Sequence, residues 1–365
     1  MSMKNYQADT PALLLDLDAV DRNIQRMGSY FQGRKACLRP HIKVHKSPFL
    51  AHKQIHAGAR GITCAKISEA EVMAYSGIDD ILIANEVVGD EKLRRLARLA
   101  KVCQIQVAVD DFENAKQLSI AASQEDSTIG VLVDVNLSAD IDGIIDRCGV
   151  PVGVPAVELS RKVAQLRNIE FKGLMGYEGG LRKFPEFAER KVAVEKALGR
   201  LVETKDMVED AGLNVGTVSC GGTRSYNIAG EFPGVTEVQA GSYVFMDATY
   251  QKFDLDFELS LTLLTSVVSR PKPDKAIIDA GYKAISADSG LPVVKDRPEL
   301  ECVSLNAEHG HLRIIKPDID VRQGDRLELV PTHVDTTVFL HDNYVLTRRD
   351  ENVGLLNIAC RGKLQ

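Results

Sequence analysis

The sequence predicts a (β/α)8 TIM-type barrel followed by a β-rich C-terminal domain. Up to about residue 250, short apolar or β-branched runs alternate with stretches of helical periodicity, a pattern typical of a parallel sheet covered by helices. About eight such units fall within about 240 residues, the usual size of a TIM-type barrel. After about residue 255 the helical periodicity fades, and strand-like runs follow one another between turn residues.

The predicted strands of the first part are nine short runs. They cover residues 12–17, 36–43, 61–66, 80–87, 104–110, 129–135, 171–177, 217–222 and 237–245. A doubly wound open sheet is the alternative arrangement of such units. However, no GxGxxG motif follows the first run, so a dinucleotide-binding half is not supported.

Helices are predicted between most of these runs. After the first run, Val20, Ile24 and Met27 recur at helical spacing, and Asp18 occupies the position of an N-cap. Residues 91–101 and 190–213 show the clearest helical periodicity, with Gly212 as the expected C-cap of the second. The chain is therefore expected to form a barrel domain over residues 1–252 and a β-rich domain over residues 253–365.

Composition limits the class of partner. The 365 residues carry a net charge of −6 and no Trp, which argues against nucleic acid as a partner. No run reaches the roughly 18 apolar residues of a membrane span, and the N-terminus has no signal-peptide core. Seven scattered cysteines without a CxxC motif are typical of reduced thiols, so we expect a cytoplasmic protein without a membrane partner.

The most informative motif is RPHIKVHK at residues 39–46. If this run is a strand, alternate residues share a face, and Arg39, His41, Lys43 and His45 lie together. In a barrel this face would point inward or toward the C-terminal mouth, where active sites lie. A buried amine there would have the conditions that make a lysine nucleophilic toward aldehydes. A solvated edge strand is the alternative, and Pro40 favours it.

Two glycine-rich turns follow late strands. Gly222 and Thr223 come after the run at 217–220, and Gly241 and Ser242 come after the run that starts at residue 237. Glycine allows backbone N–H groups to approach an anion closely, and the hydroxyls add donors. Turns after the last barrel strands commonly hold a phosphate, although ordinary tight turns would give the same pattern.

In the second domain, His333 and Asp335 lie two residues apart, so in extended backbone both side chains face the same way. An imidazole nitrogen and a carboxylate oxygen form half of a site for Zn²⁺ or Mn²⁺. No third ligand is apparent, although His341 and Asp342 follow closely. A surface His–Asp pair is the alternative.

Taken together, these motifs resemble the D-threonine aldolase and D-serine dehydratase family, which has an alanine-racemase-like, pyridoxal-phosphate-dependent fold. The resemblance runs from about residue 9 to about residue 362. Its segments are Thr10-Pro11 with LLLDLDAVDRNI, RPHIKVHKSP, GITCAKISEAE, NEVVG, RCGV, GLMGYEGG, GGT, QAGSYVFMD, DAG, EHG, PTHVD and LHD. The combination of RPHxKxHK with a late HxC or HxD is specific.

The resemblance implies roles for individual residues. Lys43 resembles the lysine that forms an imine with pyridoxal 5'-phosphate, with Lys46 as its rival in the same motif. Tyr177 and Arg147 are similar to family residues near the cofactor ring. Gly222, Thr223, Gly241 and Ser242 resemble phosphate ligands, and His333 and Asp335 resemble the ligands of a divalent metal, Mn²⁺ or Zn²⁺. A homodimer is also implied, because in relatives the second domain often covers the barrel mouth of the partner subunit.

The resemblance implies a lyase acting on β-hydroxy-D-amino acids. Retro-aldol cleavage would give glycine and an aldehyde, whereas dehydration would give a 2-oxo acid and ammonia. Asp335 favours the aldolase, because dehydratases of the family tend to have Cys in that place. The alternatives are a D-serine or 3-hydroxy-D-aspartate dehydratase or aldolase on the same scaffold, an amino-acid racemase, and a non-catalytic carrier of pyridoxal phosphate.

The sequence departs from the family pattern near the presumed base. Relatives often carry a histidine three or six residues beyond the tyrosine, where this chain has Gly180 and Lys183. The cations Arg182, Lys183 and Arg224 would suit a substrate with a second carboxylate, such as a 3-hydroxyaspartate. A solvated surface is the simpler interpretation of these three residues.

Overall fold

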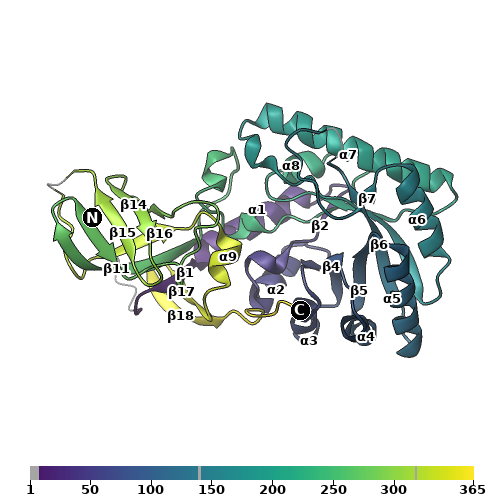
Figure 1. Cartoon of the computed structure of the whole chain (residues 1–365), viewed down its shortest axis with the longest axis horizontal. Coiled ribbons are helices and arrows are strands. Elements are labelled where there is room, and N and C mark those ends of the chain that lie inside the picture. Colours follow the sequence, from purple (N-terminus) through teal and green to yellow (C-terminus); the bar gives the residue numbers. More distant parts are fainter. Residues whose placement is uncertain (1–7, 139–140, 317–318) are drawn as a thin grey trace. The chain divides into compact units, whose positions relative to one another are not determined.

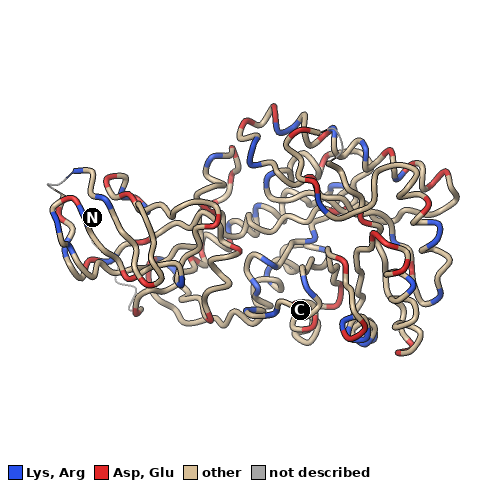
Figure 2. The backbone as a smooth tube through the Cα atoms, viewed as in Figure 1, with Lys and Arg blue, Asp and Glu red and all other residues tan. Residues whose placement is uncertain are grey.

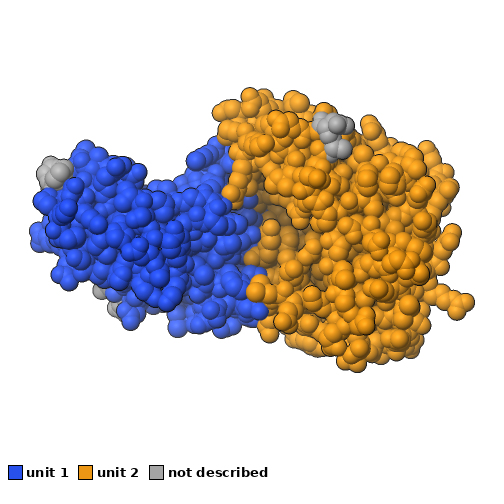
Figure 3. Space-filling model, in the orientation of Figure 1, with its two compact units in different colours: residues 1–26, 44–47, 242–362 blue, residues 27–43, 48–241, 363–365 orange. Residues whose placement is uncertain are grey.

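The computed structural model describes residues 8–138, 141–316 and 319–365. The chain divides into two compact units (Figure 3). The barrel unit comprises residues 27–43, 48–241 and 363–365. The β-rich unit comprises the chain up to residue 26 together with residues 44–47 and 242–362. The predicted domain boundary at residue 252 stays a prediction.

The barrel unit is built on eight parallel strands (Figure 1). In their order around the sheet they are β2 (Cys37–Leu38), β10 (Glu237–Val238), β9 (Thr217–Cys220), β8 (Ile169–Met175), β6 (Ile129–Asn136), β5 (Gln104–Val109), β4 (Asp80–Glu86) and β3 (Ile62–Cys64). The backbone N–H groups of Arg60 and Thr63 donate to the carbonyls of Leu38 and Pro40, at 2.9 Å each. These bonds join the first and last strands, and the predicted barrel class is confirmed. The short β7 (Val150–Pro151) pairs with β6.

Helices follow most of the barrel strands. They are α2 (Pro48–His56), α3 (Ile67–Tyr75), α4 (Asp90–Leu99), α5 (Phe112–Gln124), α6 (Val154–Ala164), α7 (Phe187–Asp210) and α8 (Tyr226–Ala229). In α4 the buried residues Leu93, Leu96 and Ala97 recur at helical spacing, so one face packs on the strands. After α7, Gly212 has φ of +86°, the left-handed conformation expected of a glycine C-cap.

Ion pairs inside the barrel unit connect two strands, β4 and β10, with the segment after β2. Arg39, which is 1% exposed, directs Nε to Glu237 at 2.6 Å and Nη1 to Asp80 at 2.7 Å. Glu237 also accepts a hydrogen bond from the Ser219 hydroxyl at 2.7 Å. Arg39 therefore holds the segment after β2 against β4 and β10.

The β-rich unit contains the remaining strands. Its sheet runs in the order β14 (Leu300–Leu305), β15 (Gly310–Ile314), β12 (Lys275–Ile278), β11 (Leu261–Lys272), β1 (Ala12–Asp16), β17 (Asn343–Arg348) and β18 (Glu351–Asn357). The strands β13 (Val293–Val294) and β16 (Arg326–Val330) pair with each other, and β16 also pairs with β11. The first predicted strand is thus not a barrel strand. It lies antiparallel to β11 and parallel to β17, and its Leu13 and Leu15 are buried.

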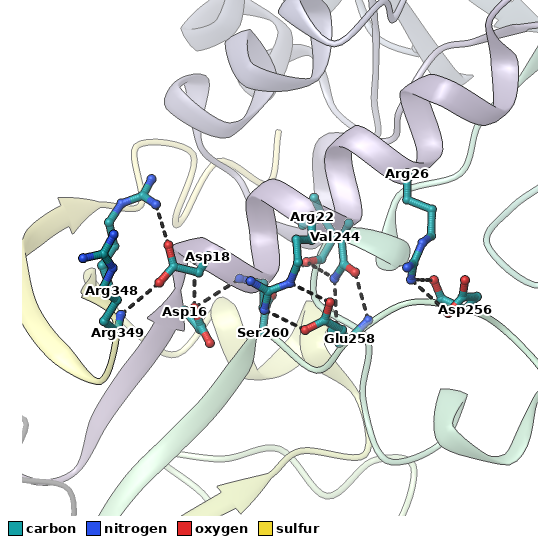
Figure 4. A network of polar contacts seen from close by, with 12 residues as sticks. Asp16, Asp18, Arg22, Arg26, Val244, Asp256, Glu258, Ser260, Arg348 and Arg349 are labelled. Atoms are coloured by element: carbon teal, nitrogen blue, oxygen red, sulfur yellow. Dashed lines mark hydrogen bonds and ion pairs between the residues drawn. The ribbon is translucent and has the colours of Figure 1, made fainter.

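Helix α1 (Leu17–Phe31) follows β1 directly, and its first turns are tied to the β-rich unit by polar contacts (Figure 4). The carboxylate of Asp16 accepts from the N–H groups of Asp18 and Ala19, so the capping residue is Asp16 and the predicted cap at Asp18 is wrong. Asp18 instead accepts from the Arg348 guanidinium at 2.7 Å and from the N–H of Arg349 at 2.9 Å.

Both signs of charge are spread along each unit, with acidic and basic residues interleaved (Figure 2). Among the described residues, no helix is both long and apolar enough to cross a membrane.

Candidate active site

The predicted cofactor residues of the barrel unit follow the carboxyl ends of its strands. Lys43 comes after β2, Arg147 after β6, Tyr177 after β8, Gly222 and Thr223 after β9, and Gly241 after β10. In a closed parallel sheet all carboxyl ends face the same mouth. These six residues therefore share one end of the barrel unit.

Lys43 lies in a single turn of 3-10 helix, η1 (Ile42–Val44), just beyond β2. Its side chain is exposed, and its backbone N–H points to His41 Nδ1 at 3.4 Å. The strand predicted over residues 36–43 ends at Leu38, so the expected common face of Arg39, His41, Lys43 and His45 does not form. Arg39 is engaged in the buried ion pairs described above, while His41 and Lys43 stay at the mouth.

The rival Lys46 belongs to the β-rich unit. It is buried, its φ is +52°, and its amine lies 5.8 Å from the centroid of the Phe339 ring. His45 is also buried, and its carbonyl accepts the hydroxyl of Tyr344 at 2.7 Å. The geometry therefore favours Lys43 over Lys46 as the accessible amine.

Tyr177, Arg147 and Gly222 meet at the barrel mouth. The guanidinium carbon of Arg147 lies 5.3 Å from the centroid of the Tyr177 ring, within cation–π distance. A Cβ atom placed on Gly222 would lie 3.4 Å from the same ring. A flat aromatic surface with a cation on it and a glycine beside it suits a planar, anionic cofactor.

Glu178 holds the turn after β9 by hydrogen bonds. The sequence assigned no role to this residue. Glu178 is fully buried, accepts from the Ser225 hydroxyl and accepts the N–H of Gly221 at 3.2 Å. Burial raises the pKa of this carboxyl, and the hydrogen bonds from Ser225 and Gly221 oppose that rise. The only signal for it in the sequence is its place next to Tyr177.

The two predicted phosphate turns differ in what they offer. The N–H of Gly222 already donates to the Ser225 hydroxyl at 3.0 Å. Gly222 therefore allows a ligand to come close to the backbone, because it has no side chain, but its N–H is already engaged. A Cβ atom on Gly241 would lie 2.5 Å from the carbonyl oxygen of His41, so glycine is required there by packing. Ser242 begins a 3-10 turn, η3 (Ser242–Val244), in the β-rich unit.

Gly180 has no room for the histidine that relatives often carry. Its φ is +95°, and a Cβ atom there would lie 2.1 Å from the carbonyl oxygen of Gly143. Lys183, the other such position, is exposed on η2 (Leu181–Lys183) and lies 3.8 Å from Asp142. The chain therefore has no histidine at either of these two positions.

A cluster that the sequence interpretation missed lies at the ends of β4 and β6. Glu86, Asp134 and Cys148 bring their side-chain ligand atoms within 4.8 Å of one another. Burial, and after it the charge of Glu86, raises the pKa of Asp134 to about 8. Burial also raises the pKa of Cys148 to about 11. Near neutral pH the Asp134 carboxyl therefore keeps its proton.

His333 and Asp335 lie in the β-rich unit at the start of α9 (Val334–Val338). Nδ1 of His333 lies 2.7 Å from a carboxylate oxygen of Asp288. Burial would raise the pKa of Asp288, but its hydrogen bonds with His333 and Ser286 outweigh burial and lower that pKa. No spacing in the sequence links residue 288 to residue 333.

The other two candidate ligands are engaged elsewhere. His341 Nε2 lies 2.7 Å from the carbonyl oxygen of Ala284, and Asp342 pairs with Arg361 at 2.8 Å. His333 and Asp335, at the start of α9, therefore stay the predicted pair of metal ligands.

Comparison with known proteins gives two family matches. The family described as "Alanine racemase, N-terminal domain" matches residues 15–249, and the one described as "Putative serine dehydratase domain" matches residues 260–347. Together they cover both parts of the predicted architecture.

Three relatives extend over nearly the whole chain. A 3-hydroxy-D-aspartate aldolase of Paracoccus denitrificans (strain Pd 1222) is 38% identical, covering 99% of this chain and 94% of the relative. A D-threonine aldolase of an Arthrobacter species is 37% identical, covering 98% and 93%. The crystal structure of a D-threonine aldolase from Filomicrobium marinum has a TM-score of 0.94 at 38% identity, covering 99% and 98%. The predicted resemblance is confirmed: the chain belongs to the D-threonine aldolase and D-serine dehydratase family, whose barrel is of the alanine racemase N-terminal type.

Proposed function

We propose that this protein is a pyridoxal-phosphate- and metal-dependent lyase that cleaves a β-hydroxy-D-amino acid into glycine and an aldehyde. The observation that carries the proposal is the similarity, over almost the full chain, to relatives named aldolases at 37–38% identity. The pair His333 and Asp335 supports it, because an aspartate stands where dehydratases of the family tend to have cysteine. A homodimer and a cytoplasmic location remain predictions.

The residues at the barrel mouth fit pyridoxal phosphate. Lys43 offers an exposed amine for covalent attachment, and Tyr177 with Arg147 offers a surface for the ring. In the barrel unit, Gly222 and Gly241 allow backbone to approach a phosphate, and Thr223 stays a predicted phosphate ligand. Ser242, in the β-rich unit, stays a predicted phosphate ligand too. When bound, the cofactor supplies an electron sink for the bond that breaks at Cα.

The residues at the start of α9 fit a divalent cation. His333 offers a nitrogen and Asp335 an oxygen, the donor types that Zn²⁺ and Mn²⁺ accept. When bound, the cation supplies a Lewis acid that lowers the pKa of the substrate hydroxyl. Cleavage needs that hydroxyl to lose its proton while the Cα–Cβ bond breaks, after which Cα takes up a proton to give glycine.

Dehydration is the second candidate, and the serine dehydratase match over residues 260–347 favours it. It would break the Cα–H bond and expel the hydroxyl with help from the same two residues. Arg182, Lys183 and Arg224 favour a substrate with a second carboxylate for either reaction.

A product assay separates these functions. Purified protein with pyridoxal phosphate and Mn²⁺ is incubated with D-threonine and, in parallel, with a 3-hydroxy-D-aspartate. We expect glycine with acetaldehyde from the first and glycine with glyoxylate from the second, and loss of both in chelator. Formation of 2-oxobutyrate and ammonia from D-threonine would instead establish a dehydratase. Turnover that survives the chelator would point to a racemase, and no turnover to a carrier.

A further inference from the structure

His333 is held in place by its own backbone. It precedes the first turn of α9, with φ of −150° and ψ of 106°. Its carbonyl oxygen accepts the hydroxyl of Thr337 at 2.9 Å and the N–H of the same residue at 3.3 Å. The backbone of His333 is therefore fixed, and with it the direction of the Cα–Cβ bond. The side-chain torsion angles of the imidazole remain to be set.

The carboxylate of Asp288 sets these torsion angles. One oxygen lies 2.7 Å from His333 Nδ1, and the other accepts the hydroxyls of Ser286 at 2.9 Å and Thr336 at 3.2 Å. A carboxylate accepts but does not donate, so His333 must carry its proton on Nδ1. In the neutral ring, the lone pair then lies on Nε2.

Nε2 is left available for a ligand. Among the residues that the structure describes, His333 makes no hydrogen bond through this nitrogen. The His333 side chain is 27% exposed, so part of the imidazole is open to solvent. A single carboxylate thus fixes both the proton position and the orientation of the imidazole.

We propose that Asp288 is the positioning residue of the metal site: it holds His333 through Nδ1 and so presents Nε2 to a divalent cation. The role rests on the metal dependence of the proposed function. Carboxylates behind a histidine ligand orient the ring and raise its basicity, and their loss typically lowers metal affinity about 10- to 100-fold.

The test measures Mn²⁺ affinity by calorimetric titration of the full chain loaded with pyridoxal phosphate. We expect Asp288→Ala to weaken binding about 10- to 100-fold and Asp288→Asn, which keeps an acceptor oxygen without the charge, to weaken it less. The matched control is Asp256→Ala, which removes an exposed carboxylate that pairs with Arg26 in the same unit. Asp288→Asn, nearly the same shape, keeps the test valid if Asp288→Ala does not fold.

A second measurement needs no metal. ¹⁵N shifts of His333 in the metal-free protein should report the tautomer with the proton on Nδ1, and Asp288→Ala should shift them toward a mixture. Unchanged affinity together with an unchanged tautomer in the Asp288 variants would overturn the role of Asp288. Wild-type protein that takes up no Mn²⁺ would instead contradict the metal dependence in the proposed function, and with it this role.

Discussion

At the scale of single residues, neighbours in the motif RPHIKVHK have very different surroundings. Arg39 is buried among acids, Lys43 is exposed at the barrel mouth, and Lys46 is buried beside Phe339. In a regular strand, alternate residues lie on the same face and would have similar surroundings. The regular strand instead ends at Leu38, since Pro40 has no N–H to donate to a neighbouring strand, and a turn of 3-10 helix begins at Ile42. The sequence therefore shows which residue types the motif contains, but not which of their side chains are buried and which are exposed.

The two lysines of the motif can be separated by spectroscopy. We expect Lys43→Ala to abolish the visible absorbance of covalently attached pyridoxal phosphate and to remove activity. Lys46→Ala should retain the absorbance, because the Lys46 side chain is buried and its amine lies 5.8 Å from the centroid of the Phe339 ring. Absorbance spectra of both variants, with circular dichroism to verify folding, make the comparison. A band that survives in Lys43→Ala and disappears in Lys46→Ala would reverse the assignment.

The buried acid Asp134 should make stability depend on pH. Its pKa in the folded protein is about 8, well above the ordinary value of 3.8, because of burial and the nearby Glu86. Between these two pH values the folded state binds more protons than the unfolded state, so stability falls as pH rises. We expect Asp134→Asn to flatten this fall between pH 5 and 8, by at most about 1.4 kcal/mol per pH unit.

Denaturant titrations at several pH values measure that slope. The matched control is Asp206→Asn in the same unit, whose exposed carboxylate pairs with Lys205 at 3.0 Å. Equal slopes for wild type and Asp134→Asn would mean that the carboxyl ionises normally in the fold.

At the scale of elements, one buried arginine connects the segment after β2 with the strands β4 and β10. Arg39 faces Glu237, which is 1% exposed, and Asp80. Removing one partner of a buried ion pair leaves an uncompensated charge and typically costs about 3–5 kcal/mol. We therefore expect Arg39→Met to lower the free energy of unfolding by about that amount, as measured by denaturant titration.

The control for this prediction is Arg94→Met on α4. Arg94 pairs with Glu91 at 2.8 Å on the exposed side of the helix, and such pairs contribute less than about 1 kcal/mol. A loss of similar size in both variants would show that the buried pairs add nothing specific.

At the scale of the whole molecule, the sequence predicted the barrel class from the spacing of its apolar residues. A repeat of 2 residues indicates a strand and a repeat of 3.6 residues indicates a helix, and both depend only on neighbouring residues. The sequence did not reveal which sheet each strand joins. The run ALLLDL has the texture of a barrel strand, yet it pairs with β11 and β17, roughly 250 and 330 residues along the chain. The partnership of Asp288 with His333 is likewise invisible in the sequence, because pairing between distant segments leaves no spacing to read.

The position of β1 in the sheet of the β-rich unit predicts that a C-terminal fragment without this strand does not fold. It lies between β11 and β17, with Leu13 and Leu15 at most 1% exposed, and burying each such side chain contributes about 1.5–3 kcal/mol. A fragment of residues 253–365 lacks this strand and should give an NMR spectrum without dispersion.

A synthetic peptide of residues 8–26 tests whether the missing β1 is the reason that the fragment does not fold. It supplies β1 together with Asp18 and Asp21, which pair with Arg348 at 2.7 Å each, so it should restore dispersion to the fragment when added in excess. The same peptide with Leu13→Ser and Leu15→Ser keeps the peptide's charges but should fail, because the strand loses two buried apolar side chains. If residues 253–365 fold cooperatively alone, the predicted boundary at residue 252 marks an independent domain, and β1 is dispensable to it.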